Sequence, residues 1–196
     1  MLNYGAAAQN YFGYKTDDLM NASLTDEQRA LVEAYDPQLF NGAIGADSSK
    51  VGNFVKTDVG FSSRSATVSF EGAFSINYYF VPNAPVDGEI ALYYWTAEDY
   101  AAAEKLMPSN ASGKTVMAAA GDGSYWAEVT GIAAKQLDDT YYVAAFYTSD
   151  FEVCCTGVIA YSLSKYCMNN AVDGNDMREL AASTAVYGYH AKAYFG

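Results

Sequence analysis

Histidine is almost absent from this sequence, since His190 is the only one among its 196 residues. Hydrolases of the Ser-His-Asp or Cys-His type need an imidazole beside the nucleophile as a general base. His190 lies off the apolar stripe of the surrounding helical pattern, so we expect its side chain to face solvent. No nucleophile-elbow pattern surrounds it. We therefore predict that the chain is not an enzyme and has no catalytic residue.

Paired carboxylates offer a route to catalysis without histidine. Glycosidases use two carboxylates held about 5 Å or about 6.5–9.5 Å apart. The acidic residues on or beside the predicted strands are Glu71, Glu89, Glu98, Asp99 and Glu128. We favour the interpretation that each of them is an outward residue of a half-buried sheet, and we keep a glycosidase as the alternative.

Cysteine is also scarce, with three residues at Cys154, Cys155 and Cys167. This number is too small for a disulfide framework, and the C-x-x-C spacing of a zinc site is missing. Neighbouring residues of a strand point to opposite faces, so Cys154 and Cys155 cannot both enter one core. We expect reduced thiols packed as small hydrophobic side chains, with a disulfide from one of this pair to Cys167 as the alternative.

Two clusters of oxygen ligands lie at residues 138–139 and 173–176, but neither has the spacing of a calcium-binding loop. Aspartate and asparagine in front of a helix usually cap it. We therefore predict no metal site and no cofactor.

Basic residues are outnumbered, with 11 Lys and Arg against 23 Asp and Glu and a formal net charge of −12. Phosphate backbones and anionic membranes attract basic surfaces, so we expect no nucleic-acid partner.

No window of the sequence approaches the roughly 18 consecutive apolar residues of a membrane span, and the start lacks signal-peptide features. We expect no membrane insertion. Because the helical pattern is already running at Leu2 and Tyr4, we interpret the chain as a segment of a longer protein.

The two ends of the chain resemble each other. Residues 4–13 match residues 187–196 at both aromatic positions of a Tyr-Phe pair, at both flanking glycines and at the first Tyr. In both copies the apolar and small residues follow the spacing of an amphipathic helix. Glycine inside a helix costs about 1 kcal/mol against alanine, so Gly5 and Gly188 indicate the close approach of another backbone. We expect the terminal helices to pack together.

Further helices are predicted from capping signals. A capping box at residues 25–28 starts one helix, and Thr96 caps a short one. Independently of capping signals, the apolar run after the last strand is expected to continue into a helix near residues 161–168. A long C-terminal helix is expected from about Asn175.

The middle of the chain changes to the period of two that is typical of strands. Residues 66–70 and 74–80 alternate as a hairpin with one buried face, and 90–94 continue the pattern. The segments 114–119 and 124–130 flank Gly121-Asp122-Gly123, a tight-turn signal, and strands follow near 140–148 and 151–158. We predict an α+β fold with an antiparallel β-sandwich-like core over 51–159. A helical segment over 1–50 and C-terminal helices over 160–196 complete a single domain.

Aromatic residues are the richest signal that could indicate a binding site. By strand alternation Tyr79, Tyr93, Trp95 and Trp126 point away from the core, and flat aromatic faces can stack on sugar rings. We therefore name these four residues as the candidate ligand-binding set, a platform on one sheet face. In the alternative interpretation, which we favour, the terminal helices cover this surface as a second core.

The string at residues 1–9, the Tyr-Phe-Gly-Tyr at 11–14, the stretch 131–139 and the ending from Tyr187-Gly188 to Tyr194-Phe195 occur together in this chain. This combination resembles an uncharacterised module that recurs in large secreted or cell-surface proteins of gut Firmicutes. The resemblance implies an extracellular or cell-surface location, and it carries no catalytic or binding residues with it. We therefore expect a non-catalytic structural or adhesion module, with a carbohydrate-binding module as the alternative. Glycan or other domains of the same polypeptide are the expected partners.

Overall fold

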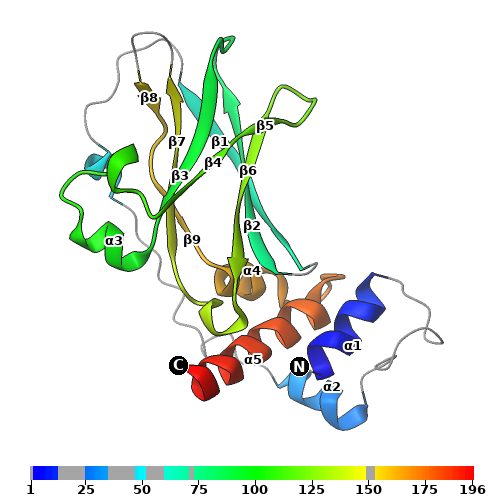
Figure 1. Ribbon diagram of the computed structural model, residues 1–196. Coiled ribbons are helices and arrows are strands. Elements are labelled where there is room, and N and C mark those ends of the chain that lie inside the picture. The colour runs from blue at the N-terminus through cyan, green and yellow to red at the C-terminus, as the bar shows by residue number, and fades with distance from the viewer. Residues whose placement is uncertain (1, 13–24, 35–46, 52–59, 71–72, 149–152) are drawn as a thin grey trace.

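A computed structural model describes residues 2–12, 25–34, 47–51, 60–70, 73–148 and 153–196. Its centre is a sandwich of two antiparallel sheets (Figure 1). Sheet I has the strand order β1 (Phe61–Ser69), β2 (Phe74–Pro82), β6 (Tyr125–Ile132) and β5 (Ala118–Ala119). Sheet II has the order β4 (Gly113–Val116), β3 (Glu89–Trp95), β7 (Tyr141–Thr148) and β8 (Val153–Cys155), and β9 (Ile159–Tyr161) also pairs with β7. The predicted fold class is confirmed.

The core between the sheets follows from the alternation of side chains along the strands. Phe74, Ile76, Tyr78 and Phe80 of β2 are buried and pack with Ile90 and Leu92 of β3 and with Val143 and Ala145 of β7. The paired strand β1 contributes Ala66 and Val68 to the same cluster. The predicted hairpin and its inward face are confirmed.

The terminal helices gather at one end of the sandwich (Figure 1). They are α1 (Leu2–Tyr11), α2 (Asp26–Glu33), α4 (Leu163–Asn170) and α5 (Arg178–Phe195). The Tyr4 ring of α1 stacks on the Tyr187 ring of α5 with 5.8 Å between centroids, which joins the equivalent tyrosines of the two similar ends. The Tyr4 hydroxyl also donates a hydrogen bond to the Phe70 carbonyl at the end of sheet I (3.0 Å). The predicted pairing of the terminal helices is confirmed.

Gly188 allows α5 to approach the loop between the sheets. A Cβ atom built on Gly188 would lie 2.8 Å from Leu137 Cδ2 and 3.1 Å from the carbonyl oxygen of Ala134, in the 3-10 turn η5 (Ala134–Gln136). Contacts this short are not available to a side chain, so the expected close approach is confirmed at Gly188.

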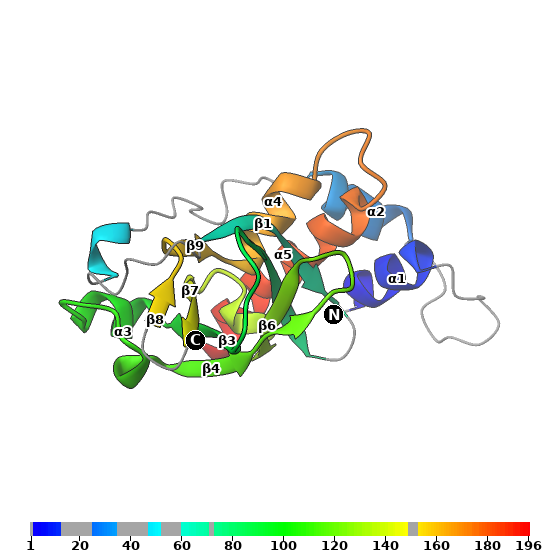
Figure 2. The same ribbon diagram turned by 90° about the horizontal axis from the view of Figure 1, so that it is seen from above.

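Sheet II carries a second core on its outer face, formed by Trp95, Leu106, Ala144, Phe146 and Val158. Its cover consists of α3 (Ala97–Ala102), the 3-10 turns η3 (Ser48–Lys50) and η4 (Pro108–Asn110), and the residues around them. Seen from above in Figure 2, η3 and α3 lie on the side away from α1 and α2. The expectation that the terminal helices cover the aromatic faces is therefore wrong for this sheet.

Hydrogen bonds hold the parts of this cover together. Lys50 Nζ donates to the carbonyl oxygens of Tyr100 and Ala103 at the end of α3 (2.8 and 3.1 Å). The Thr96 hydroxyl accepts a bond from the amide of Asp99, as the capping signal predicts. Lys50 thus satisfies two carbonyl groups at the C-terminal end of α3, and Thr96 satisfies an amide at its N-terminal end, groups that a helix end leaves without partners.

The chain crosses from one sheet to the other inside a segment that the sequence presents as one strand. Residues 113–116 pair with β3 in sheet II, and residues 118–119 pair with β6 in sheet I. Between them Met117 is buried in the core. The predicted single strand over 114–119 is thus two short strands, and the tight turn at 121–123 begins after the crossing.

Cys167 of α4 is a free thiol and is completely buried. Burial raises the pKa of this thiol to about 12. It therefore packs as a small hydrophobic side chain, and the disulfide alternative involving Cys167 is wrong. The side chains of Cys154 and Cys155 lie outside the described residues.

Candidate functional site

The four predicted aromatic residues divide between the two sheets. Tyr79 and Trp126 lie on β2 and β6 of sheet I, whereas Tyr93 and Trp95 lie on β3 of sheet II. Because the inner faces of the sheets meet in the core, the outer faces point in opposite directions. The structure does not bring the four rings together, and the prediction of one platform on one face is wrong.

Trp95 belongs to the second core. Its side chain is 0% exposed, and its indole N–H donates a hydrogen bond to Asn110 Oδ1 (3.0 Å). Tyr93 is half-buried and meets the ring of Phe146 edge to face at 5.2 Å, with Lys114 Nζ 5.8 Å from its centroid. Trp95 therefore has no surface to offer a ligand, and Tyr93 stands apart from the pair on sheet I.

Tyr79 and Trp126 are direct cross-strand neighbours. Their ring centroids are 6.5 Å apart and their planes are inclined by 24°. Rings in direct face-to-face contact would be about 3.5–4 Å apart, so these two rings are nearly parallel but displaced from direct contact. Both are half-buried, and together they form part of the floor of an open groove of about 600 Å³.

The groove owes its shape to small residues around the aromatic pair. One row across sheet I consists of Ser65, Tyr79, Trp126 and Ala118, and the next consists of Thr67, Asn77 and Glu128. Ala118 stands opposite Trp126, and Ala119 and Ala120 also line this edge. Side chains this short leave the rings uncovered, and the hydroxyls of Ser65 and Thr67 line the groove beside them.

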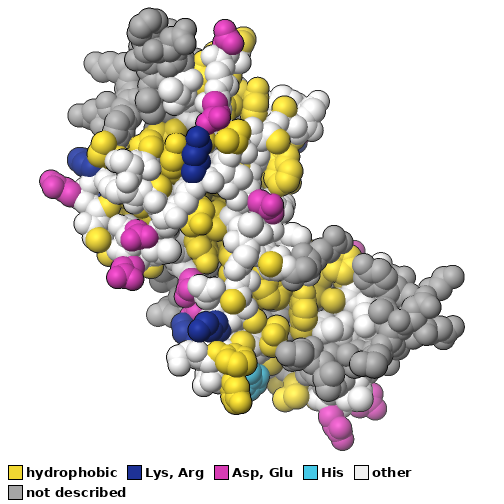
Figure 3. Space-filling model, in the orientation of Figure 1, with side chains coloured by type: hydrophobic (Ala, Val, Ile, Leu, Met, Phe, Trp, Pro, Cys, Tyr) yellow, Lys and Arg dark blue, Asp and Glu magenta, His cyan; other side chains and the backbone are white. Residues whose placement is uncertain are grey.

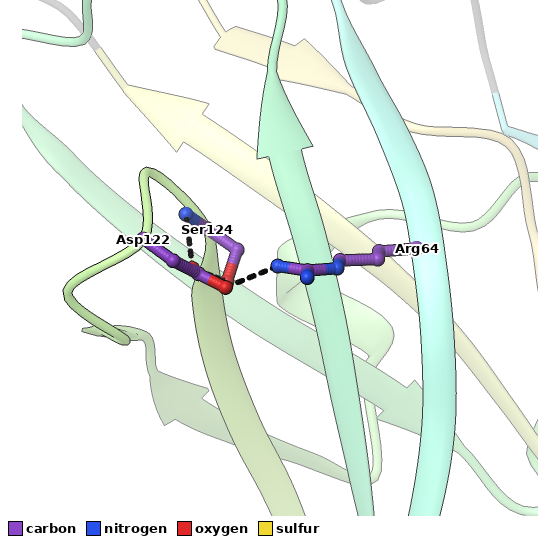
Figure 4. Close-up of polar contacts among 3 residues, drawn as sticks. All are labelled: Arg64, Asp122 and Ser124. Atoms are coloured by element: carbon purple, nitrogen blue, oxygen red, sulfur yellow. Dashed lines mark hydrogen bonds and ion pairs between the residues drawn. The ribbon is translucent and has the colours of Figure 1, made fainter.

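A β-bulge brings a charged residue into the groove. The register between β1 and β2 shifts between Ser63 and Ser65, so Arg64 is the extra residue. A bulge re-aims a side chain that regular alternation would send to the other face. The Arg64 guanidinium reaches across the sheet and forms an ion pair with Asp122 on the β5–β6 turn (Figure 4).

Asp122 is positioned by its own turn. Gly121 and Gly123 have φ values of +82° and +84°, in the left-handed region that favours glycine. Asp122 Oδ1 accepts hydrogen bonds from the backbone N–H and the hydroxyl of Ser124 (3.0 and 2.5 Å), and Oδ2 accepts from Arg64 (Figure 4). The bonds from Ser124 and Arg64 hold the pKa of the Asp122 carboxyl well below its ordinary value. The groove therefore contains an ionised Arg–Asp pair at neutral pH.

The carboxylates considered for catalysis are in separate places. Glu89 pairs with Lys114 (2.6 Å), and Asp99 accepts a hydrogen bond from Thr96 at the start of α3. Glu128 lies on the outer face of sheet I, Glu98 is exposed in the first turn of α3, and Glu71 lies outside the described residues. His190 is exposed on α5, as predicted.

Over the described residues, no group of three or more His, Cys, Asp and Glu side chains is arranged to hold a metal ion. The described helices include none that combines the length and the apolar character needed to cross a membrane.

Sequence reasoning found Tyr79, Trp126 and the tight turn but missed the role of Arg64. The sequence identifies Asp122 only as a turn residue, because its partner Arg64 lies 58 positions earlier in the chain. Arg64 is the single basic residue in the Ser-rich strand β1, and this isolated charge is the sequence feature that could have indicated a charged partner elsewhere in the chain.

Comparison with known proteins assigns no family to the chain. No protein-family model and no curated protein sequence matches it. Among solved structures, it is similar to a bromine derivative of the carbohydrate-binding module BhCBM56, with 12% identity and a TM-score of 0.32 over 51% of this chain and 97% of that one. It is also similar to a DUF3823 family protein from Bacteroides ovatus, with 17% identity and a TM-score of 0.36 over 53% of this chain and 55% of that one. The chain is a β-sandwich domain of unknown function.

Proposed function

We propose that this chain is a non-catalytic adhesion module of a secreted or cell-surface bacterial protein, and that it binds carbohydrate in the groove on the outer face of sheet I. The observation that carries the proposal is the Tyr79–Trp126 pair, which forms part of the floor of a groove of about 600 Å³ with polar groups on both sides.

The chemistry of the groove suits a sugar better than a peptide or an apolar ligand. A pyranose presents C–H groups on its faces and hydroxyls around its rim, so it needs flat apolar surfaces beneath and hydrogen-bonding groups beside it. The two displaced rings supply the surface, and Ser65, Thr67 and Arg64 supply donors and acceptors at its margin. Two adjacent rings can serve two successive residues of a polysaccharide chain.

The expected affinity is weak. By analogy with aromatic pairs, each ring contributes about 0.5–1.5 kcal/mol, which is roughly a 2- to 12-fold change in Kd. Weak binding is sufficient where several modules engage one polymer, because the first contact raises the effective concentration for the next and the avidity exceeds the affinity of each module.

Affinity electrophoresis through gels containing soluble polysaccharides tests the proposal. We expect at least one polysaccharide to retard the wild type, and we expect Trp126→Ala and Tyr79→Ala each to reduce the retardation. Tyr194→Ala is the matched control, because this tyrosine is 82% exposed on α5, away from the groove. Circular dichroism of each variant checks that the fold is intact.

The competing role is purely structural, with the module acting as a spacer or as a contact for other domains of the same polypeptide. Absence of retardation by every polysaccharide in a broad panel would favour that role and refute carbohydrate binding. Equal loss of retardation in Tyr194→Ala and Trp126→Ala would also refute the groove as the binding site.

A further inference from the structure

The charges in the groove cancel. Among the described residues that line it, the charged side chains are Arg64 and Asp122, and they are paired with each other. Outside the groove, the chain carries a formal net charge of −12. Figure 3 shows acidic side chains scattered over the visible face of the molecule, without a basic patch large enough to offset them. A ligand in this groove therefore meets a lining whose charges cancel, with the carboxylate of Glu128 in the next row of the sheet and an acidic protein around it.

We infer that the groove selects neutral polysaccharides over acidic ones, and that the Arg64–Asp122 pair is the element that makes this selection. This inference rests on the proposed function, and it names the class of carbohydrate that the same site accepts.

Hydrogen-bond capacity supports a role in binding hydroxyls. A guanidinium has five N–H donors, of which Arg64 uses its Nη1 group toward Asp122. A carboxylate has about four acceptor positions, and Asp122 uses three of them for Ser124 and Arg64. The two side chains remain 54% and 49% exposed. The pair thus offers several donors and one acceptor side by side, which is an arrangement that suits the vicinal hydroxyls of a sugar.

A uronic acid or sulfated sugar gains little from the same arrangement. The positive charge of Arg64 is compensated by Asp122 at contact distance, so an anionic group near Arg64 also lies near an ionised carboxylate. The remaining acidic surface adds repulsion at longer range, which salt screens over about 8–10 Å at physiological ionic strength. Neutral sugars avoid both penalties.

Asp122→Asn is the variant that separates the roles. The amide oxygen can still accept the two bonds from Ser124, so the turn geometry is kept while the negative charge is lost. Arg64 is then an uncompensated cation in the groove. The matched control is Glu89→Gln, which removes one negative charge from a similar exposed pair with Lys114 on the other sheet.

The experiment measures the retention of wild type, Asp122→Asn and Glu89→Gln on neutral glucan and galactan and on polygalacturonate, each at low and moderate salt. We expect the wild type to bind a neutral polymer at least tenfold more tightly than polygalacturonate. We expect Asp122→Asn to reduce this ratio by at least threefold through salt-sensitive binding of the acidic polymer. Glu89→Gln should leave the ratio unchanged.

Each outcome decides a different statement. A wild type that prefers polygalacturonate overturns the inference but leaves carbohydrate binding intact. An unchanged ratio in Asp122→Asn, or an equal change in Glu89→Gln, overturns the role of the Arg64–Asp122 pair. A wild type that binds none of these polymers or any other in the broad panel removes the proposed function itself.

Discussion

Replacing Trp95 distinguishes a core residue from a binding residue more sharply than any other substitution in this protein. Trp95 is 0% exposed and packs among Leu106, Ala144, Phe146 and Val158. Truncation of a buried Trp to Ala costs about 3–5 kcal/mol through lost burial and the cavity left behind. The Asn110 side chain keeps a partner, because its Oδ1 also accepts from the Met107 amide, so no orphaned polar group adds to this cost.

The expected loss is a large share of the stability of a domain, which is typically about 5–15 kcal/mol. At a urea slope of about 2 kcal/mol per molar, the unfolding midpoint of Trp95→Ala falls by roughly 2 M. Trp95→Phe keeps a ring in the core and loses the indole hydrogen bond, for which we expect about 1–2 kcal/mol. This milder variant gives a measurable midpoint if Trp95→Ala does not fold.

Urea unfolding followed by far-ultraviolet circular dichroism is the suitable assay. The chain contains two Trp residues, so fluorescence would lose half of its reporters in each variant. Trp126→Ala serves as the comparison, because a half-buried ring in a cross-strand pair contributes about 0.2–1 kcal/mol. A cost below about 1 kcal/mol for Trp95→Ala, or loss of glycan retention with an unchanged midpoint, would refute the assignment of Trp95 to the core.

Three further substitutions or conditions test other parts of the fold. Gly188→Ala should lower the melting temperature by several degrees, because the new Cβ atom would lie 2.8 Å from Leu137 Cδ2. This loss should outweigh the better helix propensity of alanine. A rise in melting temperature would contradict the close approach of α5 and Leu137. Thr96→Ala should cost about 0.5–2 kcal/mol in urea unfolding through loss of the α3 cap, whereas Thr96→Ser should restore most of it. Burial raises the pKa of both Tyr4 and Cys167 to about 12. These groups ionise near 10 and 8.5 in the unfolded chain, so the free energy of unfolding should fall as the pH rises from about 8.5 toward 12, and equal urea midpoints at pH 7 and pH 10.5 would refute this.

Local patterns in the sequence determined most of the secondary structure. Strand alternation placed Phe74, Ile76, Tyr78 and Phe80 on the inner face, and the cap Thr96 located the start of α3, because both signals depend on neighbouring residues alone. The similarity between the two ends also indicated that the terminal helices pair. These features need no knowledge of the rest of the chain.

The tertiary structure alone decided which outward residues remain accessible. Strand alternation assigns both Trp95 and Trp126 to an outer face. Segments distant in sequence cover Trp95 completely but leave Trp126 half-buried. Leu106 and Val158 close over Trp95, while the alanines from Ala118 onward leave Trp126 open. Coverage is a long-range packing event, and the period of a strand carries no information about it.

The partnership of Arg64 and Asp122 also depended on tertiary structure. Asp122 lies in a turn that its two glycines identify, but its ion pair requires a one-residue bulge in β1 and the placement of β2 between β1 and β6. The crossing at Met117, which moves the chain from sheet II to sheet I, brings that turn to the groove. The sequence by itself determined the helices and strands and their buried faces. The register and order of the strands decided which side chains form the groove, because strand pairing joins residues that are far apart along the chain.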